Sequence, residues 1–368
     1  MVDETVYIPV DTLHQFMIDV FLGCGVPSED AKICADVLIT SDMRGIESHG
    51  VQRLKMYYDR IKSGIQQAVT QFEVVRETPA TALVDGHHGM GQVIGHHSME
   101  LAIQKARAVG VGAVAAKNST HFGIDGYYAQ MAADAGLIGM SFTNARPSIA
   151  PTFGVQPMMG TNPIAFAVPT DEDHPFLFDA ATSIIQRGKV EIHARTGEPL
   201  PEGLVIDQNG QFATDPNQIL KGLANDTMAL LPIGGAGEDF AGYKGYGLAA
   251  MVEILCASLQ SGFFMKDLLG FDEHGNKRPF GLGHFFLAIN IEAFVELDKF
   301  KATTGAILRE LRNSRKVPGQ ERIYVAGEKE FEKEKQTRIT GIPILPSLQK
   351  ELAFMRDELG LTQYHFPF

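Results

Sequence analysis

Residues 95–116, GHHSMELAIQKARAVGVGAVAA, set the fold class of this chain. Apolar residues at helical spacing predict a helix over Gly95–Val109, and the apolar run Gly110–Ala116 predicts a strand directly after it. Gly110–Ala115 also matches GxGxxG/A, the glycine fingerprint of Rossmann-type dinucleotide binding. That fingerprint needs a strand before it and a helix after it, so that the helix N-terminus faces the pyrophosphate. Here the order is reversed, and we interpret the match as a helix-to-strand turn in a non-Rossmann fold.

Further apolar runs place several strands in the middle of the chain. The predicted strands are Thr81–Val84, Leu137–Thr143, Ile164–Val168, Pro175–Phe178 and Phe285–Phe294. A helix is predicted over Lys244–Gly262, because apolar residues recur there at helical spacing. Strands interleaved with helices indicate an α/β body with a mixed β-sheet.

Both ends of the chain are predicted to be helical. Asp11 is placed to cap a first helix, and two more helical patterns follow before residue 65. The charged segment Phe300–Lys335 and the segment from Ile344 onward also have helical patterns. We therefore expect a helical subdomain formed by residues 1–75 and 300–368, and a mixed-sheet α/β domain at residues 76–299.

The composition restricts the class of function. A chain of 368 residues is long enough for about two domains, and its formal net charge of −12 disfavours nucleic acid as a partner. A locally positive pocket can still bind a small anionic substrate. The three cysteines form no disulfide pattern, which indicates a reducing compartment. With no signal peptide and no membrane-spanning run in the sequence, we expect a cytoplasmic protein that does not interact with membranes.

Two histidines lie in settings that suit acid–base chemistry. His49 follows Ser48 and precedes Arg53 by four residues. His121 follows an apolar strand, and ligands gather at the ends of strands in α/β proteins. A histidine in such a setting can exchange a proton with a reacting group, and a nearby arginine can bind a carboxylate through two parallel hydrogen bonds. Each histidine taken alone has a structural alternative, as a side chain bonded to backbone or to solvent.

Two turns give weaker indications of a nucleotide site. Gly160–Pro163 precedes an apolar strand, and Asp179–Ser183 follows a strand-like run. The second turn carries hydroxyls and backbone N–H groups that suit a ribose or a phosphate. Ordinary turns have the same composition, so these segments gain meaning only together with the other motifs.

An ordered set of motifs runs through most of the chain. It comprises Asp42–Gly50 with Arg53, Asn118–Gly123, Tyr127–Ala129, Gly160–Pro163, Asp179–Ser183, Pro201–Gly203, Thr214–Pro216 and Gly242–Leu248. This set resembles the malate/L-lactate dehydrogenase family that is distinct from the Rossmann-type enzymes of the same names. The resemblance implies hydride transfer between a nicotinamide cofactor and a small 2-hydroxy acid, in a homodimer. It implies NAD as the cofactor, with NADP as the alternative, bound with the substrate by the mixed-sheet domain.

The resemblance also implies roles for single residues. His121 aligns with the family's proton donor and acceptor, and Ser48 and His49 align with residues beside the nicotinamide and the substrate. Arg53 aligns with the arginine that binds the substrate carboxylate, and Tyr57 lies one helical turn further on. The implied dinucleotide contacts are Asn144, Thr161, Asn162, Asp179, Ala180, Ala181, Lys244, Asn313, Ser314 and Arg315.

Departures from the family pattern concern the identity of the substrate. Thr152–Val155 stands where the family usually has a tryptophan and two glycines, Ala180 stands where methionine is usual, and Ala326–Glu328 replaces a Pro-Gly-Glu turn. We expect malate/oxaloacetate first. The alternatives are lactate, sulfolactate or ureidoglycolate, or reduction of a diketo acid or a cyclic imino acid. A second carboxylate needs a second cation, for which Arg44 and Arg146 are candidates on charge, and ordinary ion pairs are the alternative for both.

Two other classes of function are disfavoured by the sequence. His87–His88 and His96–His97 have residue types that bind metals, but they lack the HExxH spacing and any cysteine partner, so we expect no metal. A nucleotide-binding protein without activity is disfavoured, because His49, Arg53 and His121 are all present.

Overall fold

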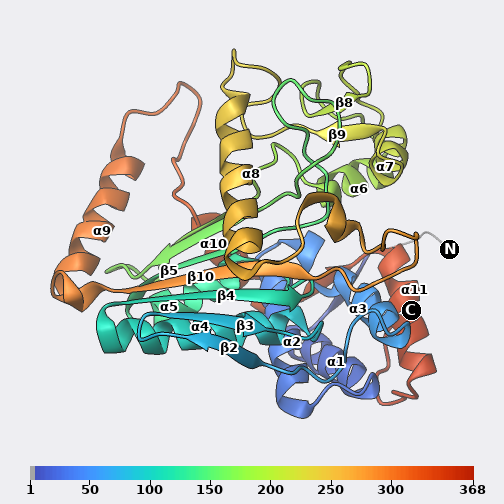
Figure 1. Cartoon of the computed structure of the whole chain (residues 1–368), viewed down its shortest axis with the longest axis horizontal. Helices are drawn as coiled ribbons and strands as arrows, with labels where there is room; N and C mark the ends of the chain where they lie inside the picture. Colours follow the sequence, from blue (N-terminus) through green and yellow to red (C-terminus); the bar gives the residue numbers. More distant parts are fainter. Residues whose placement is uncertain (1–4) are drawn as a thin grey trace.

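The computed structural model describes residues 5–368 and has a seven-stranded sheet at its centre (Figure 1). The strands are β2 (Glu73–Glu77), β3 (Thr81–Asp85), β4 (Val111–Ser119), β5 (Leu137–Thr143), β6 (Ile164–Val168), β7 (Phe176–Ala180) and β10 (Leu282–Asn290). Their order across the sheet is β2-β3-β4-β10-β5-β6-β7. β3 and β4 pair in parallel and the other neighbours pair antiparallel, so the predicted mixed sheet is confirmed.

Helix α4 (Gly91–Val109) is the crossover that makes β3 and β4 parallel. Gly110 ends this helix in the left-handed conformation, with φ +94°. Gly112 lies so close to the carbonyl oxygen of Ala102 that an added Cβ would clash with it. These two glycines therefore end the helix and allow close helix–strand packing, which confirms the helix-to-strand turn.

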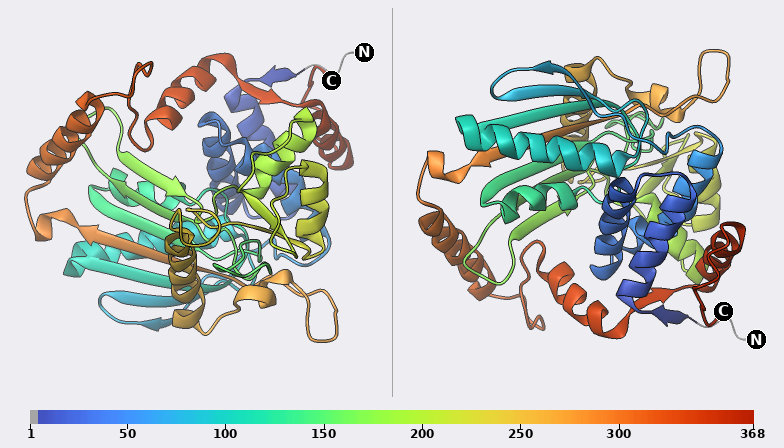
Figure 2. Two further views of the ribbon diagram at one scale, coloured as in Figure 1. Left: turned by 90° about the horizontal axis from the view of Figure 1, so that it is seen from above. Right: turned by 90° about the horizontal axis from the view of Figure 1, so that it is seen from below.

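Helices cover both faces of the sheet (Figure 2). α4 and α5 (Gly126–Asp134) pack on one face, and α8 (Gly242–Ala257) packs on the other, against β10, β5 and β4. A small lobe, which the sequence patterns did not predict, lies beside α8 (Figure 1). It consists of α6 (Arg187–Thr196), β8 (Val205–Asp207), α7 (Pro216–Ala224) and β9 (Met228–Leu230). No helix in residues 5–368 is long and apolar enough to cross a membrane.

The two ends of the chain share one hydrophobic core. From the N-terminal side come α1 (Val10–Gly23), α2 (Ser28–Met43) and α3 (Leu54–Lys62), and from the C-terminal side comes α11 (Pro346–Glu358). β1 (Val6–Ile8) pairs with β11 (Ile342–Ile344) and ties the two ends together. Helix α9 (Leu297–Asn313) contributes no residue to this core and lies at the other side of the molecule (Figure 1). The domain boundaries 1–75, 76–299 and 300–368 stay a prediction.

Some predicted elements differ from the observed ones. Pro9, and not Asp11, occupies the N-cap of α1, and Asp11 lies in the first turn without a capping bond. The last predicted strand ends at Asn290, because residues 291–293 form the short helix η5 (Ile291–Ala293).

The predicted helical segment Phe300–Lys335 is interrupted between α9 and α10 (Glu328–Thr340), where Pro318 and Gly319 favour a loop. The predicted helix Lys244–Gly262 ends at Ala257 and continues as the short helix η3 (Ser258–Gln260), and η4 (Met265–Leu269) follows.

Two short helices, η1 (Glu47–His49) and η2 (Val51–Arg53), connect α2 to α3. The carboxylate of Asp42 fixes this connection, since its Oδ2 accepts a 2.7 Å hydrogen bond from the backbone N–H of Val51. Gly50 lies directly against that carboxylate, so an added Cβ would clash with it. The constraint on Gly50 is therefore the close contact with this carboxylate.

We expect Gly50→Ala to lower the free energy of unfolding by about 1–3 kcal/mol, because the new methyl group displaces the Asp42 carboxylate. The thermal unfolding midpoint measures this loss. Gly247→Ala is the matched control, since an added Cβ there meets nothing within 4 Å. A Gly50→Ala midpoint equal to that of the control would contradict the steric argument.

Candidate active site

The connection between α2 and α3 meets the loop after β4, and five predicted site residues come together there. They are Ser48, His49, Arg53, Tyr57 and His121. The loop after β4 is held by Thr120, whose Oγ1 donates to the Gly89 carbonyl and accepts from the Gly91 N–H, both at 2.9 Å. The start of α4 thereby fixes the backbone that presents His121.

Tyr57 orients the imidazole of His121. The Tyr57 hydroxyl lies 2.6 Å from His121 Nδ1. Tyr57 is fully buried and burial raises the pKa of its hydroxyl, so the phenol stays neutral. Nε2 of His121 has no hydrogen-bond partner within residues 5–368, and it is the ring atom left to exchange a proton with a substrate.

His49 lies against His121 with nearly parallel rings, whose centroids are 5.6 Å apart. Ser48 Oγ lies 2.8 Å from His49 Nδ1 and fixes that ring in turn. Burial, with a smaller effect of the Arg53 charge, lowers the pKa of His49 to about 4. Burial first, and then the charges of His49, Arg60 and Arg53, place the pKa of His121 well below its usual range. Both imidazoles are therefore neutral at neutral pH in the free protein, and His121 can act as a base.

Arg53 connects the histidines to the small lobe. Its Nε donates to the Ser48 carbonyl at 2.6 Å, and one terminal nitrogen lies 3.9 Å from a Glu191 carboxylate oxygen of α6. Gly188, at the start of α6, lies so close that an added Cβ would be 2.8 Å from Ser48 Cβ. The guanidinium keeps N–H donors for an anion, while Ser48 and α6 limit its orientation.

His284 of β10 supports the site, and the sequence reasoning missed it. Its Nδ1 lies 2.8 Å from Thr143 Oγ1 of β5, and its Nε2 lies 2.7 Å from Ser119 Oγ of β4. Its ring stacks on Phe122, with the centroids 4.3 Å apart. Burial lowers the pKa of His284 to about 3, so this neutral residue joins three strands rather than exchanging protons. A histidine in an otherwise apolar run was the signal available in the sequence.

Three of the predicted dinucleotide contacts, Asn144, Thr161 and Asn162, make hydrogen bonds near α8 and the ends of β5 and β6. Asn144 bonds to Gly283 through its backbone N–H and its Oδ1, at 3.2 and 2.9 Å. Asn162 Nδ2 donates to the Ala249 carbonyl of α8 at 3.0 Å and to Glu253 at 2.7 Å. The Thr161 carbonyl accepts from the N–H and the hydroxyl of Thr182. These residues fix the segment between the sheet and α8, and their contact with a cofactor stays a prediction.

The remaining predicted dinucleotide contacts lie on different elements of the fold and do not come together in one place. Asp179 accepts from the Gly126 N–H at 2.7 Å and, with Arg44, lines a separate cavity of about 320 Å³. Ala180 and Ala181 follow it at the end of β7. Lys244 is exposed in the first turn of α8. Asn313, Ser314 and Arg315 are exposed at the end of α9, on the opposite side of the molecule from α3 (Figure 1).

A nicotinamide dinucleotide suits the segment between the sheet and α8. The hydroxyls of Ser148 and Thr152, in the loop between β5 and β6, and of Ser183, after β7, are buried without a hydrogen-bond partner in residues 5–368. Buried hydroxyls without partners are costly unless a ligand or water satisfies them. Ribose hydroxyls and phosphates are suitable partners, so the residues present fit such a group.

The two arginines considered for a second carboxylate differ. Arg44 Nε lies 3.2 Å from a Glu334 carboxylate oxygen and its guanidinium lies over the Phe331 ring, so the structural ion pair is the correct interpretation. Arg146 forms no ion pair within residues 5–368, and its guanidinium lies 6.0 Å from the centre of the Phe280 ring. Arg146 therefore keeps its charge available to a ligand.

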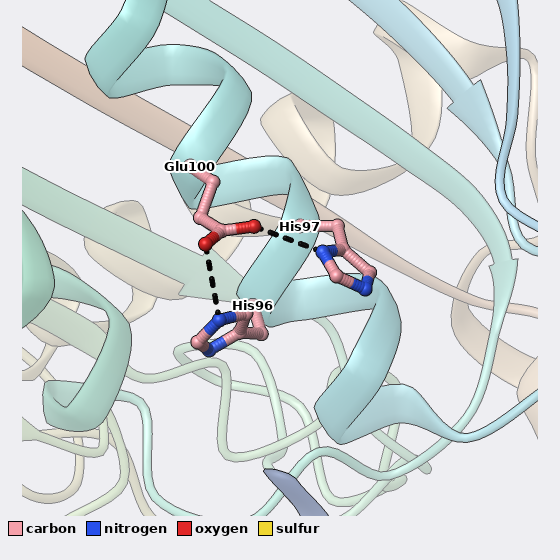
Figure 3. Close-up of side chains that lie close together, drawn as sticks. All are labelled: His96, His97 and Glu100. Atoms are coloured by element: carbon pink, nitrogen blue, oxygen red, sulfur yellow. Dashed lines mark hydrogen bonds and ion pairs between the residues drawn. The ribbon is translucent and has the colours of Figure 1, made fainter. Parts of the chain in front are cut away.

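His96 and His97 lie with Glu100 on α4 (Figure 3). The two Glu100 oxygens lie 3.3 Å from His96 Nε2 and 2.9 Å from His97 Nδ1, and the donor atoms lie within 4.8 Å of one another. The residue types suit a metal, but the carboxylate already pairs with both rings. His87 likewise pairs with Glu73, at 2.8 Å. Carboxylate partners account for His87, His96 and His97, and the expected lack of a catalytic metal stays a prediction.

Comparison with known proteins gives a consistent result over the whole chain. A profile of the family described as Malate/L-lactate dehydrogenase matches residues 8–353. Malate dehydrogenase of Pyrococcus abyssi is 46% identical over 361 residues, which are 98% of this chain and 97% of that protein. L-sulfolactate dehydrogenase of Methanocaldococcus jannaschii is 40% identical over 350 residues, which are 95% of this chain and 96% of that protein. The crystal structure of malate dehydrogenase from Entamoeba histolytica superposes with a TM-score of 0.95 at 40% identity, over 99% of this chain and 100% of that chain.

Proposed function

Because the chain belongs to the malate/L-lactate dehydrogenase family and is thereby an oxidoreductase, we propose that it interconverts malate and oxaloacetate with NAD. NADP is the alternative cofactor. The observation that carries the proposal is the His49–His121 pair beside Arg53, with His121 Nε2 free to exchange a proton. Relatives named malate dehydrogenase support the choice of malate.

Each protein group in this proposal has a separate chemical task. The nicotinamide supplies hydride chemistry when it is bound. Arg53 binds the carboxylate next to the reacting carbon, and His121 Nε2 takes the hydroxyl proton in oxidation or donates it in reduction. Tyr57 holds His121 Nδ1, and Ser48 holds His49, so neither ring needs to reorient during the reaction.

The low pKa of His121 gives the two directions opposite pH dependences. Oxidation needs neutral His121, which is the form present in the free protein at neutral pH. Reduction needs protonated His121, which the nearby positive charges disfavour. A substrate carboxylate bound to Arg53 offsets that charge, so the pKa of His121 rises in the complex.

We expect kcat/KM for reduction to fall about tenfold per pH unit above neutrality, and kcat/KM for oxidation to be level there. The kcat profile for reduction reports the pKa of His121 in the substrate complex, and the kcat/KM profile reports it in the free protein. The first pKa should therefore lie above the second. Initial rates between about pH 6 and pH 9 in both directions measure these profiles. His97→Gln is the control, and its profiles should match those of the unchanged protein. A kcat/KM for reduction that stays level across this range would contradict His121 as the acid.

A cofactor-oxidation assay tests the proposal itself. The purified protein is offered NADH or NADPH together with oxaloacetate, pyruvate or a cyclic imino acid, and the loss of the reduced nicotinamide's absorbance is followed. Fast turnover with NADH and oxaloacetate is the expected result. Turnover with only another acceptor would replace the proposed substrate. Binding of NADH without any turnover would contradict the proposed activity.

We also propose that the protein is a homodimer. α8 packs on the sheet with one side and exposes apolar residues on the other, including Leu248, Met251 and Ile254. An apolar patch of this kind supports contact with another protein surface. Light scattering measures the mass in solution, and a monomer at micromolar concentration would contradict the proposal.

A cytoplasmic location completes the proposal. Cys24, Cys34 and Cys256 are free, and burial raises the pKa of the Cys34 and Cys256 thiols well above their usual range. Buried, protonated thiols without disulfides suit a reducing compartment. Cell fractionation checks this, and recovery from an oxidising compartment would contradict it.

A further inference from the structure

Two arginines, Arg53 at the N-cap of α3 and Arg60 within it, lie on the side of the helix that faces the histidine pair. Arg53, Tyr57 and Arg60 follow one another at intervals of four and three residues, so they lie on the same side of the helix. The Tyr57 hydroxyl lies against His121, which fixes the direction of this face. The Arg60 charge is also among the causes that lower the pKa of His121, after burial and His49. Arg60 therefore lies on the same side of the helix as Tyr57 and Arg53.

Arg60 shares an aromatic ring with Arg146. The guanidinium of Arg60 lies 4.5 Å from the centre of the Phe280 ring, and that of Arg146 lies 6.0 Å from the same centre. Arg60 comes from α3, Arg146 from the segment after β5 and Phe280 from the segment before β10. The fold thus brings two cations and one ring together from three distant parts of the sequence. Cation–π contact holds each guanidinium while leaving its N–H groups free.

Neither arginine has a carboxylate partner, although the chain is acidic. The chain has 44 acidic and 32 basic residues, and several other arginines form ion pairs: Arg44 with Glu334, Arg309 with Asp171, and Arg312 with Glu172. Within residues 5–368 no ion pair forms with Arg60 or Arg146, and Asp226 acts on Arg146 only from beyond ion-pair distance.

The unpaired charges carry a cost that a ligand can offset. Burial lowers the pKa of Arg60, and the charges of Arg146 and Arg53 lower it further. Like charges held together near a low-dielectric site repel each other. A bound anion would remove that repulsion, as it does for clustered arginines in general.

We propose that Arg60, Phe280 and Arg146 form a subsite for the second anionic group of the substrate, while Arg53 binds its first carboxylate. The subsite rests on the proposed function and specifies its substrate class. Arg60 lies seven positions after Arg53, about 10 Å along a helix axis, so the two guanidinium groups can bind different ends of one small substrate. The substrates are four-carbon 2-hydroxy diacids, or analogues with a sulfonate in place of the distal carboxylate.

Reduction of oxaloacetate and of 2-oxobutyrate tests the subsite. These two acids have the same chain length, and 2-oxobutyrate carries a methyl group in place of the distal carboxylate. We expect Arg146→Gln to lower kcat/KM for oxaloacetate by roughly tenfold to a hundredfold, with little change for 2-oxobutyrate. Arg60→Gln should act in the same direction, and the double variant should lose most of the preference for the diacid.

Control variants distinguish the subsite from a general effect of removing a positive charge. Arg76→Gln removes an exposed arginine of the edge strand β2 and should leave both substrates unchanged. Thermal unfolding of the Arg60 variant shows whether it folds, and the exposed Arg146 gives an independent variant. An unchanged ratio of the two kcat/KM values in Arg146→Gln would overturn the subsite. A raised KM for NADH, with that ratio constant, would assign the arginines to the cofactor phosphates and overturn it as well.

Titration calorimetry tests the subsite without turnover. Malate and 2-hydroxybutyrate are titrated into the protein, and malate is expected to bind roughly tenfold or more tightly, with the difference lost in the double variant. Equal affinities in the unchanged protein would overturn the proposal. If the protein reduced no 2-oxo acid at all, the proposed function would fail, and these affinities would still decide the subsite.

Discussion

Replacing His121 by alanine is expected to lower kcat by roughly 10²–10⁴-fold in both directions. The reason is that Nε2 of His121 is the ring atom left free next to Arg53, while Nδ1 is held by Tyr57. His49 lies against His121 with its Nδ1 held by Ser48, and in this proposal it orients the substrate and the nicotinamide while His121 exchanges the proton. Steady-state rates with saturating substrate in each direction measure the loss.

His97→Ala is the matched control for this variant. It removes the same side chain from the exposed side of α4, where His97 pairs with Glu100. Its kcat should equal that of the unchanged protein, and it also tests whether the histidine cluster on α4 serves catalysis through a metal. Turnover of His121→Ala within about tenfold of the unchanged protein would remove His121 from the mechanism.

Replacing Arg53 by alanine is expected to raise KM for the 2-oxo acid by roughly a hundredfold, through the loss of a charge-assisted bidentate contact of about 3 kcal/mol. The effect on kcat should be smaller, because the carboxylate is bound in both the ground state and the transition state. Some loss of kcat follows from the hydrogen bond between Arg53 and the Ser48 carbonyl, which also positions His49. KM and kcat with oxaloacetate separate the two effects.

Two further variants refine the Arg53 prediction. Arg53→Lys keeps the charge but loses the planar guanidinium that can bind both carboxylate oxygens. Its KM should therefore lie between those of the unchanged protein and of Arg53→Ala. Arg76→Ala, on the edge strand, should leave KM unchanged. An unaltered KM in Arg53→Ala for every 2-oxo acid tried would show that the carboxylate binds elsewhere.

The sequence predicted the strands β5 and β6 to the residue, because each is a short apolar run between turns. The reversed order of helix and strand around Gly110 is also visible in the sequence, and this order excludes a Rossmann site there. Local patterns were sufficient in these places because helix, turn and strand are each specified within a few residues.

Elements whose boundaries depend on distant contacts were predicted less well. β10 begins and ends earlier than its apolar pattern suggests, since pairing with β4 and β5 fixes its register. The small lobe was missed, because its strands and helices are short and pack mainly on one another. Asp11 was a suitable capping residue, but Pro9 already occupies the N-cap of α1.

The histidines were identified from their local motifs, but their mutual geometry was not. Nothing in the sequence shows that Tyr57 reaches Nδ1 of His121 or that the rings of His49 and His121 lie face to face. Arg60 was overlooked, because its meaning depends on Phe280, which is 220 positions further along the chain. Such contacts are made by tertiary structure, and single-sequence patterns carry no direct signal for them.

The central position of β10 constrains how the protein can be made. Residues 73–119 contain β2, β3 and β4, and residues 137–180 contain β5, β6 and β7, so both groups of strands are synthesised before β10. Until β10 pairs with β4 and β5, the edges of these two strands have no partner. The distance along the chain is long, since 139 positions separate Asn144 from its partner Gly283. Pairing over such a sequence separation is slow, and open edges favour aggregation in the meantime. The same late strand carries His284, which ties β4 to β5 beside the loop of His121. A nascent chain therefore completes its sheet and supports its catalytic loop in one event, after most of the polypeptide has been synthesised.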